Sequence, residues 1–193
     1  MGITKKAFTF IEIVVVIGVI SISLPVLFTI IFAITNQTLK VQRLSEVKKQ
    51  GDYAINVMEN IIRSYAVKIY SEDTLTNEQC TTVASTYPSP ASSDGKNFFI
   101  EDKSNESFSF QISNFRIASN SSVLASDVFL MSDKIRIDNF AIQCNRKAVN
   151  SLPIISISFD ICYKNPSSGD CIFTRKEETA SLYYQTKIKL RNY

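Results

Sequence analysis

The sequence predicts an α+β protein in which one long N-terminal helix, half membrane-spanning and half amphipathic, packs on an antiparallel β-sheet. Three observations support this prediction. First, 27 consecutive uncharged residues separate Glu12 from Lys40, and 17 of the 22 residues in Ile13–Ile34 are Ala, Val, Ile, Leu or Phe. Second, apolar residues at helical spacing continue to about position 70. Third, the C-terminal half contains alternating apolar and polar residues, which are typical of strands.

The composition argues against an enzyme. The 193-residue chain suits one domain with an appended segment, and it contains no His. It therefore has no imidazole general base, no His-activated nucleophile and no HExxH zinc site. Its five Gly residues never cluster, so neither a P-loop nor a dinucleotide-binding fingerprint can form. The formal net charge of +3 gives no strong electrostatic case for nucleic acid, and we expect neither a cofactor nor a metal.

The apolar segment is long enough to cross a membrane once. As a helix, Ile13–Ile34 would extend roughly 33 Å, which spans a bilayer core. A cleaved secretory signal fits poorly, because the run is long, carries Glu12 near its start and lacks a small-residue cleavage site. A plain anchor is the simpler alternative. Its basic flanks, if anything, place the C-terminal part in the cytoplasm, whereas four Cys favour an oxidising compartment.

A third interpretation accounts for both the acidic residue and this conflict. The segment Lys5–Val16 (KKAFTFIEIVVV) resembles the N-terminal signal of type IV pilins and pseudopilins, which has a short basic leader, a cut before Phe and a Glu five residues into the mature chain. The resemblance implies that residues 1–7 are a leader, that a prepilin peptidase cuts between Ala7 and Phe8, and that Phe8 becomes N-methylated. The family usually has Gly where this chain has Ala7. The resemblance also implies a single-pass protein of the inner or cytoplasmic membrane, with its C-terminal domain outside the cytoplasm or on a surface or periplasmic filament.

Glu12 and Pro25 are the two unusual residues of the apolar segment. A carboxylate at the bilayer centre costs about 2.5–3.5 kcal/mol, so Glu12 either lies at the headgroup boundary or has a partner. The resemblance implies that Glu12 pairs with the Phe8 amine of a neighbouring subunit during assembly, which would set the register. Pro25 removes one backbone hydrogen bond and kinks or opens a helix. The resemblance suggests a segment that loosens on assembly, and a simple kink tolerated by lipid is the alternative.

The helix is predicted in two parts, residues 8–39 in the membrane or filament core and residues 40–70 as an amphipathic continuation. The apolar face of the second part combines alternating spacings of three and four with an Ile every seven residues. Its members are Leu44, Val47, Gly51, Ala54, Met58, Ile61 and Tyr65, with Ile55, Ile62 and Ile69. The four basic residues at its start are expected to form a solvated collar rather than a lipid or DNA site. They are Lys40, Arg43, Lys48 and Lys49.

The remaining chain is predicted as a variable surface loop over residues 71–97, rich in Ser, Thr, Pro and Asn, followed by a β-rich domain over residues 98–193. Alternation predicts strands at 108–112, 135–142, 155–161 and 182–190. The apolar parity changes between Ile137 and Phe140, which predicts a bulge at Asp138–Asn139. The simplest assembly is one antiparallel sheet on the amphipathic helix.

Four cysteines permit three disulfide connectivities. Cys162 and Cys171 flank the turn Lys164–Asp170 and would clip its hairpin, and Cys80 and Cys144 would then tie the long loop to the sheet. This pairing is a preference. A zinc site is less favoured, because His is absent and the spacings do not resemble CxxC pairs.

A second, weaker resemblance covers the other end of the chain. Val47–Ser64, with its MExxIR pattern, and Tyr184–Asn192, ending in LRN, look similar to larger minor pilins and J-type pseudopilins. Together the two resemblances imply a non-catalytic subunit that initiates or caps a type IV pilus or type II secretion-like filament. Its implied partners are the prepilin peptidase, other pilins or pseudopilins, the membrane and, indirectly, an assembly platform protein and ATPase.

The alternative is a bitopic, membrane-anchored module for adhesion or for DNA uptake in competence, which need not be a filament subunit. The basic residues Lys187, Lys189 and Arg191 alternate on one face of the last predicted strand and could bind anions. A solvated strand face is the simpler interpretation of that stripe.

Overall fold

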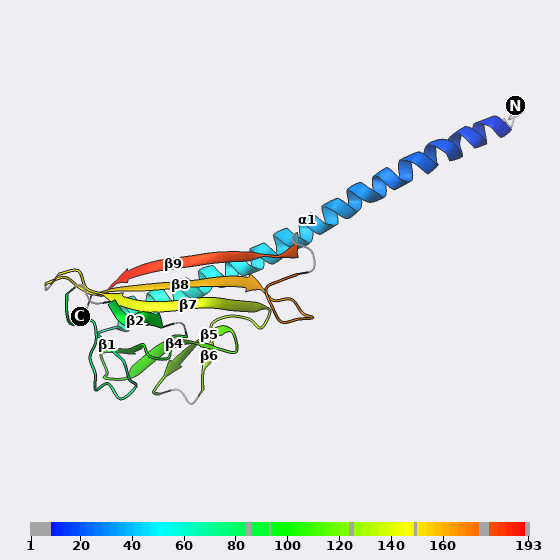
Figure 1. The fold of residues 1–193 in the computed structure, drawn as a ribbon. Helices are drawn as coiled ribbons and strands as arrows, with labels where there is room; N and C mark the ends of the chain where they lie inside the picture. The colour runs from blue at the N-terminus through cyan, green and yellow to red at the C-terminus, as the bar shows by residue number, and fades with distance from the viewer. Residues whose placement is uncertain are drawn as a thin grey trace, which may run out of the picture.

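The α+β class is confirmed, with one long helix on antiparallel sheets (Figure 1). The computed structural model describes residues 9–83, 86–92, 94–123, 126–148, 150–173 and 178–191, without the side chains of residues 89–92. The predicted cleavage and methylation positions, Ala7 and Phe8, lie outside the described residues. Helix α1 (Phe10–Tyr65) projects from the domain over its N-terminal half and packs against it over its C-terminal half.

The packed half of α1 buries one face. Its buried residues follow spacings of three and four, as an amphipathic helix requires. They are Val47, Gly51, Ala54, Met58 and Ile62. The predicted face is therefore largely right, although Leu44 and Tyr65 at its two ends are exposed. This face contacts strands β8 (Ile154–Tyr163) and β9 (Ser181–Lys189).

The helix ends earlier than predicted, at Tyr65 instead of residue 70. Ala66 is already extended, with φ −63° and ψ 126°, and Lys68–Tyr70 forms strand β1. This strand pairs antiparallel with β3 (Phe99–Glu101). Ile69 is buried as the heptad pattern requires, but a strand buries it equally well, and its neighbour Tyr70 also favours extended backbone.

The strands form two sheets instead of the single predicted one. The five-stranded sheet has the order β1-β3-β4-β5-β6, with β4 at Ser107–Ser113, β5 at Arg116–Ser121 and β6 at Val128–Phe129. The four-stranded sheet has the order β2-β7-β8-β9, with β2 at Thr86–Ser92 and β7 at Ile135–Asn145. Alternation of apolar and polar residues identifies strands but does not show which strands pair. The same sequence pattern is therefore compatible with one sheet or with two.

Strand β2 also corrects the prediction that residues 71–97 are only a loop. It pairs antiparallel with β7, with Thr86 opposite Asn145 and Tyr87 opposite Cys144. Cys144 also bonds to Cys80, so the disulfide and the strand hold this segment at the same place. Strand β2 is therefore held by β7 and by the Cys80–Cys144 disulfide, both of which involve residues far away in the sequence. The polar local sequence of β2 could not predict either contact.

The predicted bulge is confirmed. The β7–β8 register shifts between Asp138 and Ala141, and Asn139 has a positive φ of 52°. The extra residue resets the side-chain parity, so Ile137 before the bulge and Phe140 after it both face the core. The core is one buried cluster that joins α1 to both sheets, with Met58, Phe110 and Phe159 among its largest members.

Candidate membrane segment and its junction with the domain

The N-terminus of α1 is closed by a capping box. Thr9 is the N-cap residue, and its backbone N–H and its hydroxyl each donate to Glu12 Oε2 over 2.8 Å. The Glu12 N–H donates in return to Thr9 Oγ1 over 3.4 Å. Glu12 therefore also caps the N-terminus of its own helix, a role that the sequence interpretation did not include. The T-x-x-E spacing at the start of an apolar run is the signal for it.

From Phe10 to Thr35 every residue of α1 is exposed, and most of these side chains are apolar. Among the described residues, α1 is the helix long and apolar enough to cross a membrane, with a mean hydropathy of 2.8 in its most apolar window. The hydroxyls of this segment donate to carbonyls three or four residues earlier in the same helix, at 2.7–2.9 Å. They belong to Ser21, Ser23, Thr29 and Thr35. These hydroxyls therefore need no water, as a lipid environment requires.

Pro25 lies within this segment, and α1 continues through it as one helix. Its missing N–H leaves the Ser21 carbonyl without the usual helical donor. The structure thus accommodates the proline within the helix, and loosening on assembly stays a prediction.

Arg43 joins the helix to the domain at the end of the apolar segment. Its Nη1 donates to the Glu178 carbonyl over 3.1 Å and to Glu178 Oε2 over 3.2 Å. Its guanidinium carbon lies 4.4 Å from the centre of the Phe173 ring and 5.6 Å from that of Tyr163. The prediction of a solvated collar is wrong for Arg43, because its planar guanidinium stacks on aromatic rings. The three lysines of the collar are exposed.

Tyr184 makes a second contact between helix and domain. Its hydroxyl lies 2.9 Å from Asp52 Oδ1 and 3.1 Å from the Lys48 carbonyl, and its ring stacks on Phe159 with the centroids 5.5 Å apart. Burial, followed by the hydrogen bond to Asp52 and its negative charge, raises the pKa of Tyr184 to about 12. The ring lies directly over Gly51, where an added Cβ would be 2.4 Å from Cε2.

The structure contains two disulfides, Cys80–Cys144 and Cys162–Cys171, which are the pairs that the spacing favours. The Asp138 carboxylate lies close to the second pair. Because both sulfurs are already bonded to each other, this group offers a metal only one carboxylate.

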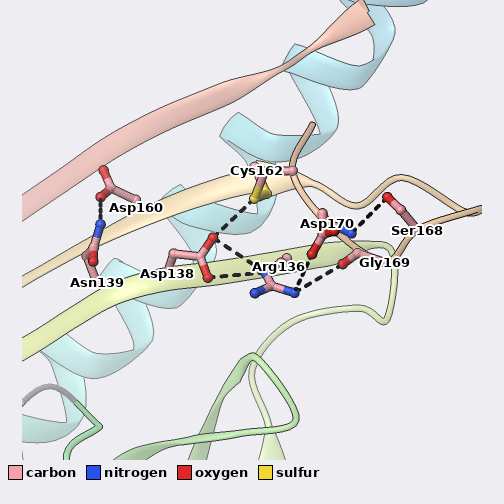
Figure 2. A network of polar contacts seen from close by, with 9 residues as sticks. Arg136, Asp138, Asn139, Asp160, Cys162, Ser168, Gly169 and Asp170 are labelled. Carbon is pink, nitrogen blue, oxygen red and sulfur yellow. Dashed lines mark hydrogen bonds and ion pairs between the residues drawn. A yellow bond between two sulfur atoms is a disulfide. The ribbon is translucent and has the colours of Figure 1, made fainter. Parts of the chain in front are cut away.

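A polar network beside that disulfide holds the loop after β8 against β7 (Figure 2). Arg136 Nε lies 3.1 Å from Asp138 Oδ1, and Arg136 Nη1 lies 3.4 Å from Asp170 Oδ1 and 3.3 Å from the Gly169 carbonyl. Across the bulge, Asn139 Nδ2 donates to Asp160 over 2.7 Å. The network therefore positions the loop and leaves its acidic groups paired.

The predicted basic stripe is present on the exposed face of the last strand. Lys187, Lys189 and Arg191 are exposed along β9 and just beyond it. Ile188 and Leu190, between them, face the core. This is the alternation that the sequence predicts.

No protein family, curated protein or solved structure matches this chain. A long N-terminal apolar helix packed on an antiparallel sheet is consistent with a pilin-like fold.

Proposed function

We propose that the protein is a minor pilin or pseudopilin, a non-catalytic subunit that initiates or caps a type IV pilus or type II secretion-like filament after a prepilin peptidase removes its leader. One observation supports this most. Glu12 is the single charged residue between Phe10 and Leu39, on a helix whose apolar side chains are exposed along this whole stretch. A helix of this kind needs an apolar environment, and a cationic partner would offset the cost of placing its one carboxylate there.

The capping box leaves the carboxylate able to take that cation. Both Thr9 donors bond Oε2, so Oε1 is available to the amine of a mature N-terminus at Phe8 in a neighbouring subunit. A buried carboxylate without a partner is strongly disfavoured, so the pair would select one register between adjacent helices. Apolar packing of like helices would supply the remaining contacts.

The junction would carry the domain outward as the helix leaves the membrane. Arg43 and Tyr184 attach the second half of α1 to the end of β8 and to β9, so the domain and this half of the helix move together. An ATPase acting through a platform protein would supply the work of extracting the apolar half from the bilayer.

The test is a Glu12→Gln variant in cells that contain a prepilin peptidase and the assembly machinery. We expect normal leader removal but loss of the protein from sheared filaments or from cross-linked pseudopilin complexes. Glu46→Gln, the same change in the packed half of α1, is the matched control and should be incorporated normally. Incorporation of Glu12→Gln at the wild-type level would contradict the filament role.

A second candidate is the membrane-anchored adhesion or DNA-uptake module, supported by the exposed stripe of Lys187, Lys189 and Arg191. Charge reversal of all three should abolish DNA binding by the purified full chain if this stripe is the site. Binding that survives the reversal excludes the stripe as the DNA site.

A further inference from the structure

One end of the domain lies level with the end of the apolar segment. A cavity of about 380 Å³ is lined by four residues of α1 and two of the domain, which are Leu39, Gln42, Arg43, Glu46, Lys134 and Tyr163. Lys134 immediately precedes β7, and Tyr163 ends β8. These strand ends therefore approach the helix where it leaves the domain (Figure 1), next to the proposed membrane surface.

Three cations at this end of the domain form no ion pair within the described residues, although the carboxylates of Asp133 and Glu46 line the same cavities. A cavity of about 200 Å³ is lined by Arg116, Arg136 and Lys164, with Asp133 as its single carboxylate. Arg136 is paired with two aspartates, as described above. In the described part of the chain, no ion pair involves Arg116, Lys134 or Lys164. The backbone N–H of Lys164 donates to the Lys134 carbonyl over 2.8 Å, which places the two lysines side by side.

Two large apolar side chains accompany these cations. Phe115 is 53% exposed and lies under the Arg136 guanidinium, with 3.9 Å from its carbon to the ring centre. Ile172 is 76% exposed, although its neighbours Cys171 and Phe173 are both held in place. The Ile172 carbonyl also accepts a hydrogen bond of 2.9 Å from Asn165. The fold therefore holds this isoleucine in solvent on a tethered loop.

We propose that this surface, which we call the proximal face and define by Phe115, Arg116, Lys134, Lys164 and Ile172, docks on the headgroups of anionic phospholipids. Lysines near such a surface attract its negative charge, and apolar side chains between them enter the headgroup layer. The proposal rests on α1 spanning a membrane and is independent of filament assembly. Docking holds the domain against the bilayer surface.

The absence of Trp from the chain provides a direct test. The full-length Ile172→Trp variant is placed in nanodiscs of phosphatidylcholine with brominated acyl chains, either alone or mixed equally with phosphatidylglycerol. We expect Trp fluorescence to shift to the blue and to be quenched by bromine only with phosphatidylglycerol, and high salt should reverse both effects. Val123→Trp, which lies beyond the opposite end of β5 and is 69% exposed in the wild type, should show neither effect.

A matched pair of charge variants, each in the Ile172→Trp background, identifies the surface. Lys134→Gln/Lys164→Gln should weaken docking by a factor of about 30, because each cation near an anionic surface contributes about a fivefold preference. Lys187→Gln/Lys189→Gln removes the same charge from β9 and should leave docking unchanged. Both proteins must keep the wild-type unfolding transition.

Two results would overturn the lipid proposal. One is a fluorescence spectrum of the Ile172→Trp protein that is identical in the two lipids, which would show that the proximal face does not recognise anionic headgroups. The other is equal docking by the two double-lysine variants. A Glu12→Gln protein that fails to assemble but still docks would separate this proposal from the filament role.

Discussion

Gly51 and Tyr184 fit together as a single contact between helix and sheet. The Tyr184 ring occupies the space that a side chain at position 51 would need, and its hydroxyl reaches the helix backbone at Lys48. The helix approaches β9 this closely because position 51 has no Cβ. The ring is in turn held by Phe159, so it cannot move aside freely.

Gly51→Ala should destabilise the protein. A Cβ placed 2.4 Å from the Tyr184 ring requires the ring or the helix to shift, and overpacking of this kind costs about 1–3 kcal/mol. Alanine gains up to about 1 kcal/mol in helix propensity, so the net loss is smaller. Urea unfolding of the full chain in detergent, followed by circular dichroism, measures it.

Gly18→Ala is the matched control, because an added Cβ there meets no atom within 4 Å. It should not destabilise the protein. If Gly51→Ala stabilised the protein as much as Gly18→Ala did, the proposed fit between Gly51 and Tyr184 would be wrong.

Tyr184→Phe should lower the free energy of unfolding by about 1–2 kcal/mol near neutral pH, because it removes the hydroxyl but keeps the ring stack. Tyr183→Phe is the control, since Tyr183 is 62% exposed on the neighbouring position of the same strand. A loss of equal size in both variants would contradict the role assigned to the hydroxyl.

The same hydroxyl predicts a pH dependence. Folding raises the pKa of Tyr184 from 10.0 to about 12, so the folded state holds this proton more tightly. The resulting stability is fully present below pH 10 and is lost as the pH rises toward 12. Burial also raises the pKa of Tyr70 and of Tyr87. The loss of wild-type stability at high pH therefore includes the ionisation of these two tyrosines. The difference between wild type and Tyr184→Phe isolates Tyr184, and it should shrink over this range.

The two disulfides should differ in their contribution to stability. Cys80–Cys144 closes a loop with a sequence separation of 64, and Cys162–Cys171 one with a separation of 9. Loop-closure entropy predicts losses of about 4 and about 2.5 kcal/mol when each pair is replaced by Ser. The free energies of unfolding of the two double-Ser proteins show which disulfide contributes more. The reverse order would show that the first bridge does not act by restricting the unfolded chain.

Local periodicity was sufficient to predict the elements whose burial repeats regularly. The run of Ile at alternate positions in β8 and the parity change before Phe140 both follow from one face meeting the core. The apolar spacing of α1 likewise predicts the buried face that includes Val47 and Met58. The uncharged run before it predicts the apolar segment.

Features that depend on distant partners could not be predicted. Just after α1 ends, Lys68–Tyr70 pairs with β3, and β2 pairs with β7, with Tyr87 opposite Cys144. Where the apolar segment meets the domain, the role of Arg43 depends on Glu178, 135 residues away, and on two aromatic rings. Glu12 stands out in the sequence because a single carboxylate in an apolar run has a free-energy cost in lipid that the run itself reveals. Its proposed partner lies in another subunit, so the sequence of this chain does not show the contact.

The mass of the mature N-terminus tests the central claim most directly. In cells that contain a prepilin peptidase, we predict a chain that begins at an N-methylated Phe8 and lacks residues 1–7. An Ala7→Gly variant, which introduces the residue usual at this position in type IV pilins, should be cleaved at least as completely. An intact Met1–Ala7 in the wild-type protein from those cells would contradict the account.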